Sequence, residues 1–86
     1  MIVHVPTPLR SYTGERATVE ADGGTLDDIL RDLDRQFPGL RFRIINEAEH
    51  VRRHIKLFVG PDVTEDLGQP TGGARDVHII CAISGG

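Results

Sequence analysis

The sequence predicts an α+β fold, in which a mixed sheet of four or five strands packs against one main helix. Segments of alternating apolar and polar residues occur in both halves of the chain, as expected for half-buried strands. One segment between them has apolar residues at helical spacing instead. The 86 residues are enough for one small core, so we expect a single domain over 1–86.

The first two strands are predicted near the N-terminus. Residues 1–5 alternate, with Met1, Val3 and Val5 on one face, and Pro6 ends the strand. Residues 6–15 form a turn-rich connection, and residues 16–21 alternate again. This spacing predicts a hairpin with a long loop.

The main helix is predicted to begin after Thr25, which can cap its N-terminus, with Asp28 three residues later as a weak capping box. The residues Pro38 and Gly39 end it. Apolar side chains recur at helical spacing along one side of this segment: Leu26, Ile29, Leu30, Leu33 and Phe37.

The second half of the chain predicts two further strands. Residues 40–50 fit either a short helix or an irregular packed loop. Residues 54–60 alternate, with Ile55, Leu57 and Val59 inward and His54, Lys56 and Phe58 outward. Residues 61–76 read as loop, with room for a brief strand at Val63, and 77–83 as the last strand. In that last strand, Val77, Ile79, Cys81 and Ile83 share one face and His78, Ile80 and Ala82 the other. The first and last strands should be neighbours in the sheet.

Composition argues against several classes of protein. The net charge of −3 disfavours nucleic acid as a partner. No apolar run approaches the roughly 20 residues of a membrane span, and the N-terminus lacks a signal-peptide pattern. The single cysteine excludes an internal disulfide and a four-cysteine iron–sulfur cluster, and it indicates a reducing, cytoplasmic location.

The last three residues, Ser84, Gly85 and Gly86, follow the final strand directly. A terminal glycine pair can be a frayed end without function. The alternative is a thin tail that enters a narrow site on another protein, because glycine has no Cβ and allows close backbone approach.

Four segments of the chain together resemble the MoaD/ThiS family of ubiquitin-like sulfur carriers. They are "VPTPLRSYTGE", "TLDDILRDLDRQFPGLRFRI", "HIKLFVG" and "DVHIICAISGG", and the resemblance extends over essentially all 86 residues. The terminal Gly-Gly is its specific motif. The long segment 40–54 and the "PTPLRSYTG" opening look most like the molybdopterin-type and cysteine-biosynthetic carriers. Gly60-Pro61 replaces a frequent Asn-Gly turn of the family, and Cys81 stands where proline is common.

The resemblance implies a β-grasp fold and a chemistry at Gly86. A ubiquitin-activating-type adenylyltransferase would use ATP and magnesium to adenylate the carboxylate of Gly86. A persulfide or sulfide from a sulfurtransferase or another source would then displace AMP and leave a thiocarboxylate. A biosynthetic acceptor enzyme of cysteine, molybdopterin, thiamine or specialised metabolism would take the sulfur. The chain would be a co-substrate with no bound cofactor, and not an enzyme.

The outward face of the sheet is the candidate docking surface for these partners. His78, Ile80 and Phe58, with His4, would form a half-apolar patch, and Arg52, Arg53 and Lys56 would add electrostatic steering. The alternative is a set of ordinary exposed residues.

Other candidate sites are weaker. Ser84 has no obvious base, and Cys81 is interpreted as a small buried hydrophobe. His50 and His54 are four residues apart, but no third metal ligand is evident near them. We therefore expect neither a catalytic set nor a metal site.

Two alternatives to a sulfur carrier remain open. A ubiquitin-like modifier would use the same tail to join Gly86 to lysines of other proteins. A plain interaction module would need no chemistry at Gly86, so deletion of that residue would leave it intact. An independent enzyme lacks a recognisable site.

Overall fold

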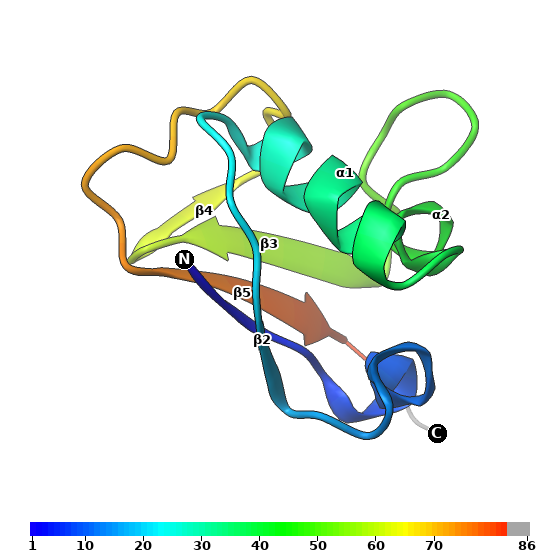
Figure 1. Cartoon of the computed structure of the whole chain (residues 1–86). Coiled ribbons are helices and arrows are strands. Elements are labelled where there is room, and N and C mark those ends of the chain that lie inside the picture. Colours follow the sequence, from blue (N-terminus) through cyan, green and yellow to red (C-terminus); the bar gives the residue numbers. More distant parts are fainter. Residues whose placement is uncertain (83–86) are drawn as a thin grey trace.

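The structure, a computed structural model, describes residues 1–82, and a five-stranded sheet lies at its centre (Figure 1). The strand order is β2-β1-β5-β3-β4, in which β1 and β5 run parallel and every other neighbouring pair is antiparallel. The predicted pairing of the first and last strands is therefore confirmed. The strands are β1 (Ile2–His4), β2 (Thr18–Glu20), β3 (Ile55–Val59), β4 (Asp62–Thr64) and β5 (Asp76–Cys81).

The main helix, α1 (Leu26–Gln36), crosses one face of this sheet (Figure 1). The Thr25 side chain accepts a hydrogen bond from the Asp28 backbone N–H at 3.2 Å, which confirms the predicted cap. Phe37 lies just beyond the helix, because Pro38 disfavours helical backbone at the residue before it.

Two segments for which the sequence predicted turns, or either a helix or a loop, are helical in the structure. The connection predicted as turns is a 3₁₀-helix, η1 (Thr7–Thr13), which ends at Gly14 in the left-handed region. The segment after α1 contains a short helix, α2 (Leu40–Ile44), one of its two predicted alternatives. The brief strand at Val63 is confirmed as β4.

The core lies between α1 and the sheet. Ile55, Leu57 and Val59 of β3 are buried as predicted, and Leu57 pairs with Ile79 of β5. Each such side chain contributes roughly 1.5–3 kcal/mol on burial. The opposing residues of α1 and α2 are completely buried: Leu26, Ile29, Leu30, Leu33, Leu40 and Ile44.

The long loop after β4 holds the start of α1. The backbone N–H groups of Leu26 and Asp27 donate to the carbonyl oxygens of Gln69 and Leu67, each at 2.9 Å. Those N–H groups have no partner inside the helix, so the loop supplies the acceptors. This arrangement of one helix against a mixed sheet agrees with the expected β-grasp fold. Among residues 1–82, no helix is long and apolar enough to cross a membrane.

Candidate functional site

Strand β5 leads directly towards the predicted tail. It is hydrogen-bonded to β1 on one side and β3 on the other, and the Ala82 N–H beyond it donates to the His54 carbonyl at 2.7 Å. The chain is thus fixed within the sheet up to residue 82. The predicted tail, Ser84, Gly85 and Gly86, lies outside the described residues.

The predicted docking residues of β3 and β5 do meet on the outer face of the sheet. Phe58 lies opposite His78, and Lys56 lies opposite Ile80. Ile80 is 43% exposed, and Phe58 and His78 are half-buried. We call Phe58, His78 and Ile80 the outer-face patch.

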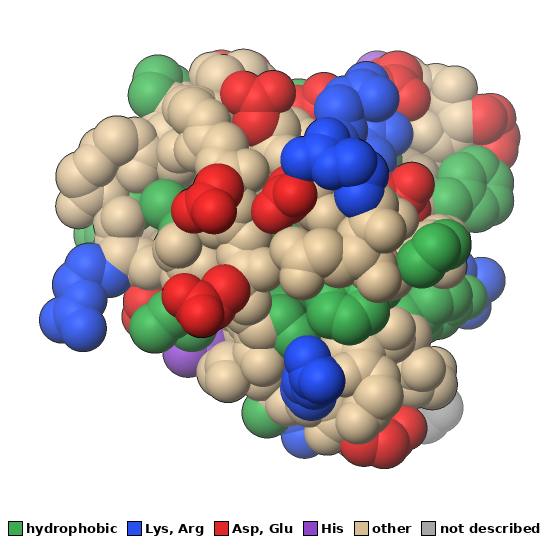
Figure 2. Space-filling model, viewed as in Figure 1, with side chains coloured by type: hydrophobic (Ala, Val, Ile, Leu, Met, Phe, Trp, Pro, Cys, Tyr) green, Lys and Arg blue, Asp and Glu red, His purple; other side chains and the backbone are tan. Residues whose placement is uncertain are grey.

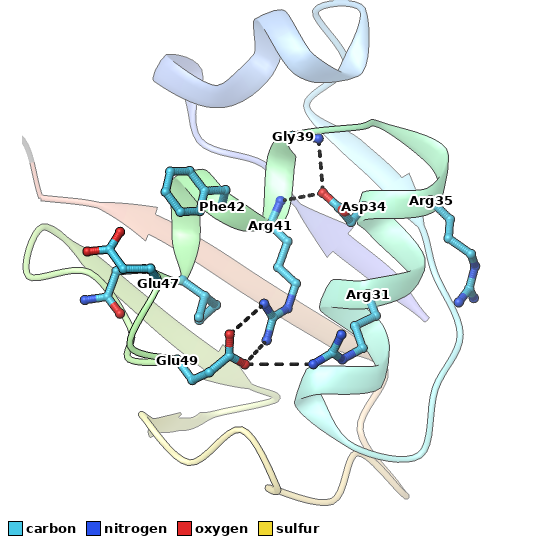
Figure 3. Close-up of a pocket in the computed structure, with 10 residues that line it drawn as sticks. Arg31, Asp34, Arg35, Gly39, Arg41, Phe42, Glu47 and Glu49 are labelled. Carbon is cyan, nitrogen blue, oxygen red and sulfur yellow. Dashed lines mark hydrogen bonds and ion pairs between the residues drawn. The ribbon is translucent and has the colours of Figure 1, made fainter.

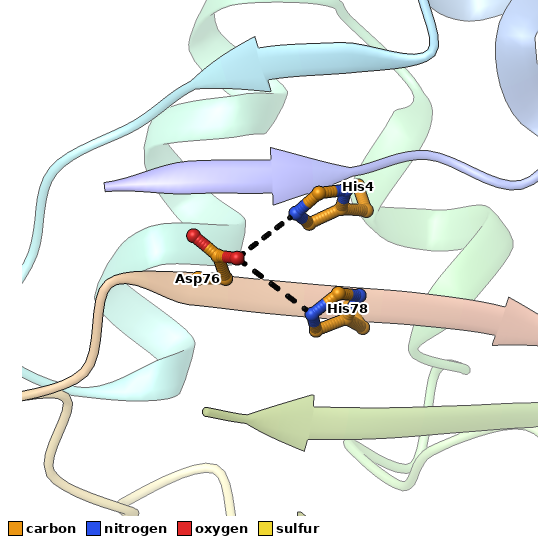
Figure 4. A group of neighbouring side chains, drawn as sticks. All are labelled: His4, Asp76 and His78. Carbon is orange, nitrogen blue, oxygen red and sulfur yellow. Dashed lines mark hydrogen bonds and ion pairs between the residues drawn. The ribbon is translucent and has the colours of Figure 1, made fainter. Parts of the chain in front are cut away.

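His4 and His78 stack beside one another on this face, joined by a carboxylate that sequence reasoning missed (Figure 4). The two rings are nearly parallel, 6° apart in plane, with centroids 4.1 Å apart. An oxygen of Asp76 lies 3.2 Å from His4 Nε2 and 3.9 Å from His78 Nε2. Only the register of β1 against β5, which pairs Ile2 with Asp76 and His4 with His78, reveals this cluster.

Arg52 lies apart from the outer-face patch. Its Nε donates to the Phe42 carbonyl at 2.7 Å, and its guanidinium stacks over the Phe42 ring at 4.7 Å. These contacts hold it at α2, where it lines a hollow with Arg43, His54 and Cys81 at the end of β5. Arg53 is exposed on the turn before β3. The arginines that lie near the end of β5 are therefore Arg52 and Arg43. Arg43 was not among the predicted docking residues.

Cys81 is half-buried rather than fully buried, and it packs against the core. Burial raises the pKa of its thiol above the ordinary value. The thiol is thus a weak nucleophile at neutral pH, which suits a position five residues before Gly86, the residue at which the family resemblance implies chemistry.

A charged hollow lies between α1 and α2, with Arg41 at its centre (Figure 3). The Arg41 guanidinium donates to Asp27 at 2.7 Å and to Glu49 at 2.9 Å, and Arg31 contacts both carboxylates. Three of the charged residues that line this hollow, Arg31, Arg41 and Glu49, are thus paired with one another. On the same side of the molecule, acidic and basic side chains interleave over the helices (Figure 2). The ion pairs of Arg41 therefore join α1 to the loop after α2, and we interpret this group of charges as structural.

Comparisons with known proteins place the whole chain among small carriers. It is 28% identical over 89 residues to the sulfur carrier protein CysO of Mycobacterium bovis and of Mycobacterium tuberculosis, which covers 98% of this chain and 96% of theirs. It is 30% identical to a chain in the crystal structure of the Amycolatopsis orientalis BexX/CysO complex, with a TM-score of 0.89 over 99% of this chain and 98% of that one. No protein-family model matches it.

A more distant likeness is to SAMP1 from Haloferax volcanii, at 25% identity and a TM-score of 0.76 over 100% of this chain and 98% of that one. A crystal structure of Haloferax volcanii small archaeal modifier protein 1, at 22% identity and a TM-score of 0.74, covers 96% of this chain and 97% of that one and shows the same fold.

Proposed function

The chain belongs to the CysO-type family of ubiquitin-like sulfur carrier proteins, and we propose that Gly86 is the residue that carries the sulfur. The observation that carries this proposal is the full-length similarity to CysO, combined with a sequence that ends in Ser84, Gly85 and Gly86. As a carrier, the chain is a co-substrate, and the chemical steps take place in partner enzymes.

The proposed reaction has two steps at the Gly86 carboxyl group. A carboxylate oxygen attacks the α-phosphorus of ATP in a magnesium-dependent activating enzyme, and pyrophosphate leaves. The sulfur of hydrosulfide, or the terminal sulfur of a sulfurtransferase persulfide, then attacks the carbonyl carbon, and AMP leaves. With hydrosulfide the product is a thiocarboxylate. With a persulfide it is an acyl disulfide, and a second thiol then attacks the sulfurtransferase sulfur, which forms a disulfide there and releases the thiocarboxylate. The thiocarboxylate sulfur passes to an acceptor enzyme.

The tail suits this use because of its length and its residues. The sheet fixes the chain as far as Ala82, and four residues follow. A peptide of four residues spans at most about 14 Å when fully extended. A partner must therefore approach the end of β5 closely to reach Gly86, and the glycines keep the tail thin enough for a narrow site.

We infer that the outer-face patch is where such a partner docks. Phe58, His78 and Ile80 offer apolar area on the strands next to the tail, and exposed Lys56 lies beside them. Arg43 and Arg52 at the end of β5 add positive charge, which favours an acidic surface on the partner.

A second candidate function, joining of Gly86 to lysines of other proteins, is favoured by the likeness to SAMP1. Both functions begin with the same adenylation but differ in the acceptor. A carrier yields a thiocarboxylate, whereas a modifier yields isopeptide adducts in the cell.

Pyrophosphate exchange tests the shared first step. The purified chain is mixed with its activating enzyme, ATP and magnesium, and the exchange of labelled pyrophosphate into ATP is followed. Exchange should require Gly86, so it should be lost when Gly86 is deleted and when one alanine is added after it. Exchange that persists in both variants would contradict a reaction at Gly86 and favour a plain interaction module.

A further inference from the structure

Three side chains with metal-binding atoms converge on the outer face of the sheet (Figure 4). They are His4 of β1 and Asp76 and His78 of β5, and their donor atoms all lie within 4.8 Å of one another. We propose that these three residues bind a divalent transition-metal cation, with Zn²⁺ the ion that fits best. This proposal does not depend on the chemistry at Gly86.

The distances are close to those of a metal site. Zinc bonds of 2.0–2.2 Å in a tetrahedron place neighbouring ligand atoms about 3.3–3.5 Å apart. The Asp76 oxygen lies 3.2 Å from His4 Nε2 and 3.9 Å from His78 Nε2. The two rings are nearly parallel, so each must turn out of the stack before both Nε2 atoms can point at one ion.

The backbone under the cluster is well fixed. β1 lies between β2 and β5, and β5 lies between β1 and β3, so neither strand is at an edge of the sheet. Their register sets His4 beside His78 and Ile2 beside Asp76. Ligands carried on such inner strands keep their spacing without the ion, which lowers the ordering cost of binding.

The types of donor select the class of ion. Two imidazoles with one carboxylate suit zinc and its neighbours in the first transition series, whereas magnesium and calcium prefer oxygen ligands. The side chains of His4, Asp76 and His78 are 36%, 34% and 38% exposed, so solvent reaches the cluster. A water molecule can thus fill the fourth position.

Binding replaces one interaction that is already present. His4 Nε2 and the Asp76 carboxylate are within hydrogen-bond distance, so a proton on that nitrogen would be donated to the oxygen. An ion that takes this place requires the neutral ring to carry its proton on Nδ1 instead. The alternative is that the cluster only stabilises the pairing of β1 with β5.

The test is a calorimetric titration of the full-length chain, without a histidine tag, with Zn²⁺. A Cys81→Ala background removes the one thiol, which also binds zinc. We expect one ion per chain. Each of His4→Ala, His78→Ala and Asp76→Asn should weaken Zn²⁺ binding at least about tenfold, because losing even a residue that only orients a metal ligand costs about that much. When Co²⁺ replaces Zn²⁺, the Cys81→Ala parent should show the visible absorption of a four-coordinate site, and the three cluster variants should not.

The double variant His50→Ala/His54→Ala is the matched control, because both of these histidines are exposed and lie outside the cluster. It should bind as the parent does. Circular dichroism checks that each variant keeps its fold, and Zn²⁺ should raise the melting temperature of the parent and control but not of His78→Ala. No saturable Zn²⁺ binding, or binding that survives all three cluster substitutions, would overturn the proposal.

Discussion

Asp27 shows how single residues fix the helix layer. It accepts hydrogen bonds from Arg31 at 2.8 Å and Arg41 at 2.7 Å, and Arg41 also binds Glu49. Partial burial alone would raise the pKa of Asp27, but the hydrogen bonds from Arg41 and Arg31 bring that pKa below its usual value. The pKa of Glu49 is lowered by its hydrogen bond with Arg41. The ion pairs therefore tie α1 to α2 and to the loop that follows α2.

We predict that Asp27→Asn lowers the free energy of unfolding at pH 7 by about 1–2 kcal/mol, because charge-assisted hydrogen bonds to both arginines are weakened. The folded pKa of Asp27 lies below the unfolded value of 3.8. Its stabilising effect is thus complete above about pH 4 and disappears as the pH falls through the folded pKa.

Urea unfolding from pH 7 to pH 2.5 measures this effect. The difference between the parent and Asp27→Asn should shrink below pH 4, while exposed Glu47→Gln should unfold as the parent does at pH 7. A difference that is constant over the whole range would show that the Asp27 charge contributes nothing.

Among the elements, α1 depends on two separate devices at its first turn. Thr25 caps one N–H group, and the loop after β4 accepts two more through Leu67 and Gln69. The cap is visible in the sequence, but the loop contacts join residues about 40 positions apart and follow only from the folded chain.

We predict that Thr25→Ala lowers the free energy of unfolding by about 1 kcal/mol, because the Asp28 N–H loses its acceptor. Thr25→Ser keeps the hydroxyl and should differ from the parent by less than about 0.5 kcal/mol. Urea denaturation of the three proteins is the measurement. Equal stability of Thr25→Ala and the parent would mean that the hydrogen bonds from the loop are enough to hold the first turn of α1.

The strands and α1 could be predicted because each carries a strong period of its own. The alternation of Ile55, Leu57 and Val59 is enough to place β3. The 3₁₀-helix η1 was missed because its turns carry no amphipathic period, and only Leu9 and Thr13 within it are buried. Short 3₁₀ turns are common as connectors and take their stability from packing.

Some residues of the candidate site could likewise be placed from the sequence, and others could not. Phe58, His78 and Ile80 could be placed on one face from alternation alone. The position of Arg52 could not, since it depends on contacts with Phe42 of α2. Asp76 was counted as part of a loop, and its place beside His4 depends on a pairing between residues over 70 positions apart.

At the scale of the whole molecule, the two faces of the sheet differ: one contributes to the core, and the other carries the proposed docking surface. Helix α1 covers one face and completes the core, and the other face carries the outer-face patch beside the strand that leads to the tail. A partner that docks on this face, as proposed, approaches the end of β5, from which the chain continues to Gly86. Residues that bind the partner can therefore be changed without loss of the core.

We predict that Ile80→Asp weakens binding of the activating enzyme at least about tenfold, because a charge replaces an exposed apolar side chain on the proposed docking surface. Ala48→Asp is the matched control, since Ala48 is also exposed but lies in the loop after α2, outside the proposed docking surface. It should change the dissociation constant less than twofold. Surface plasmon resonance measures both, and equal effects of the two substitutions would place the docking surface elsewhere.

The most direct test of the carrier function is the accurate mass of the chain isolated from its own host under sulfur-replete conditions. Replacement of one terminal oxygen by sulfur adds about 16 Da, close to the gain from oxidation of Met1 or Cys81. A thiol-selective tag and the mass of the C-terminal fragment locate the change. We predict a thiocarboxylate on Gly86 that is absent when Gly86 is deleted. A bare carboxylate on the parent, with the activating enzyme present, would contradict the assignment of Gly86 as the sulfur-carrying residue.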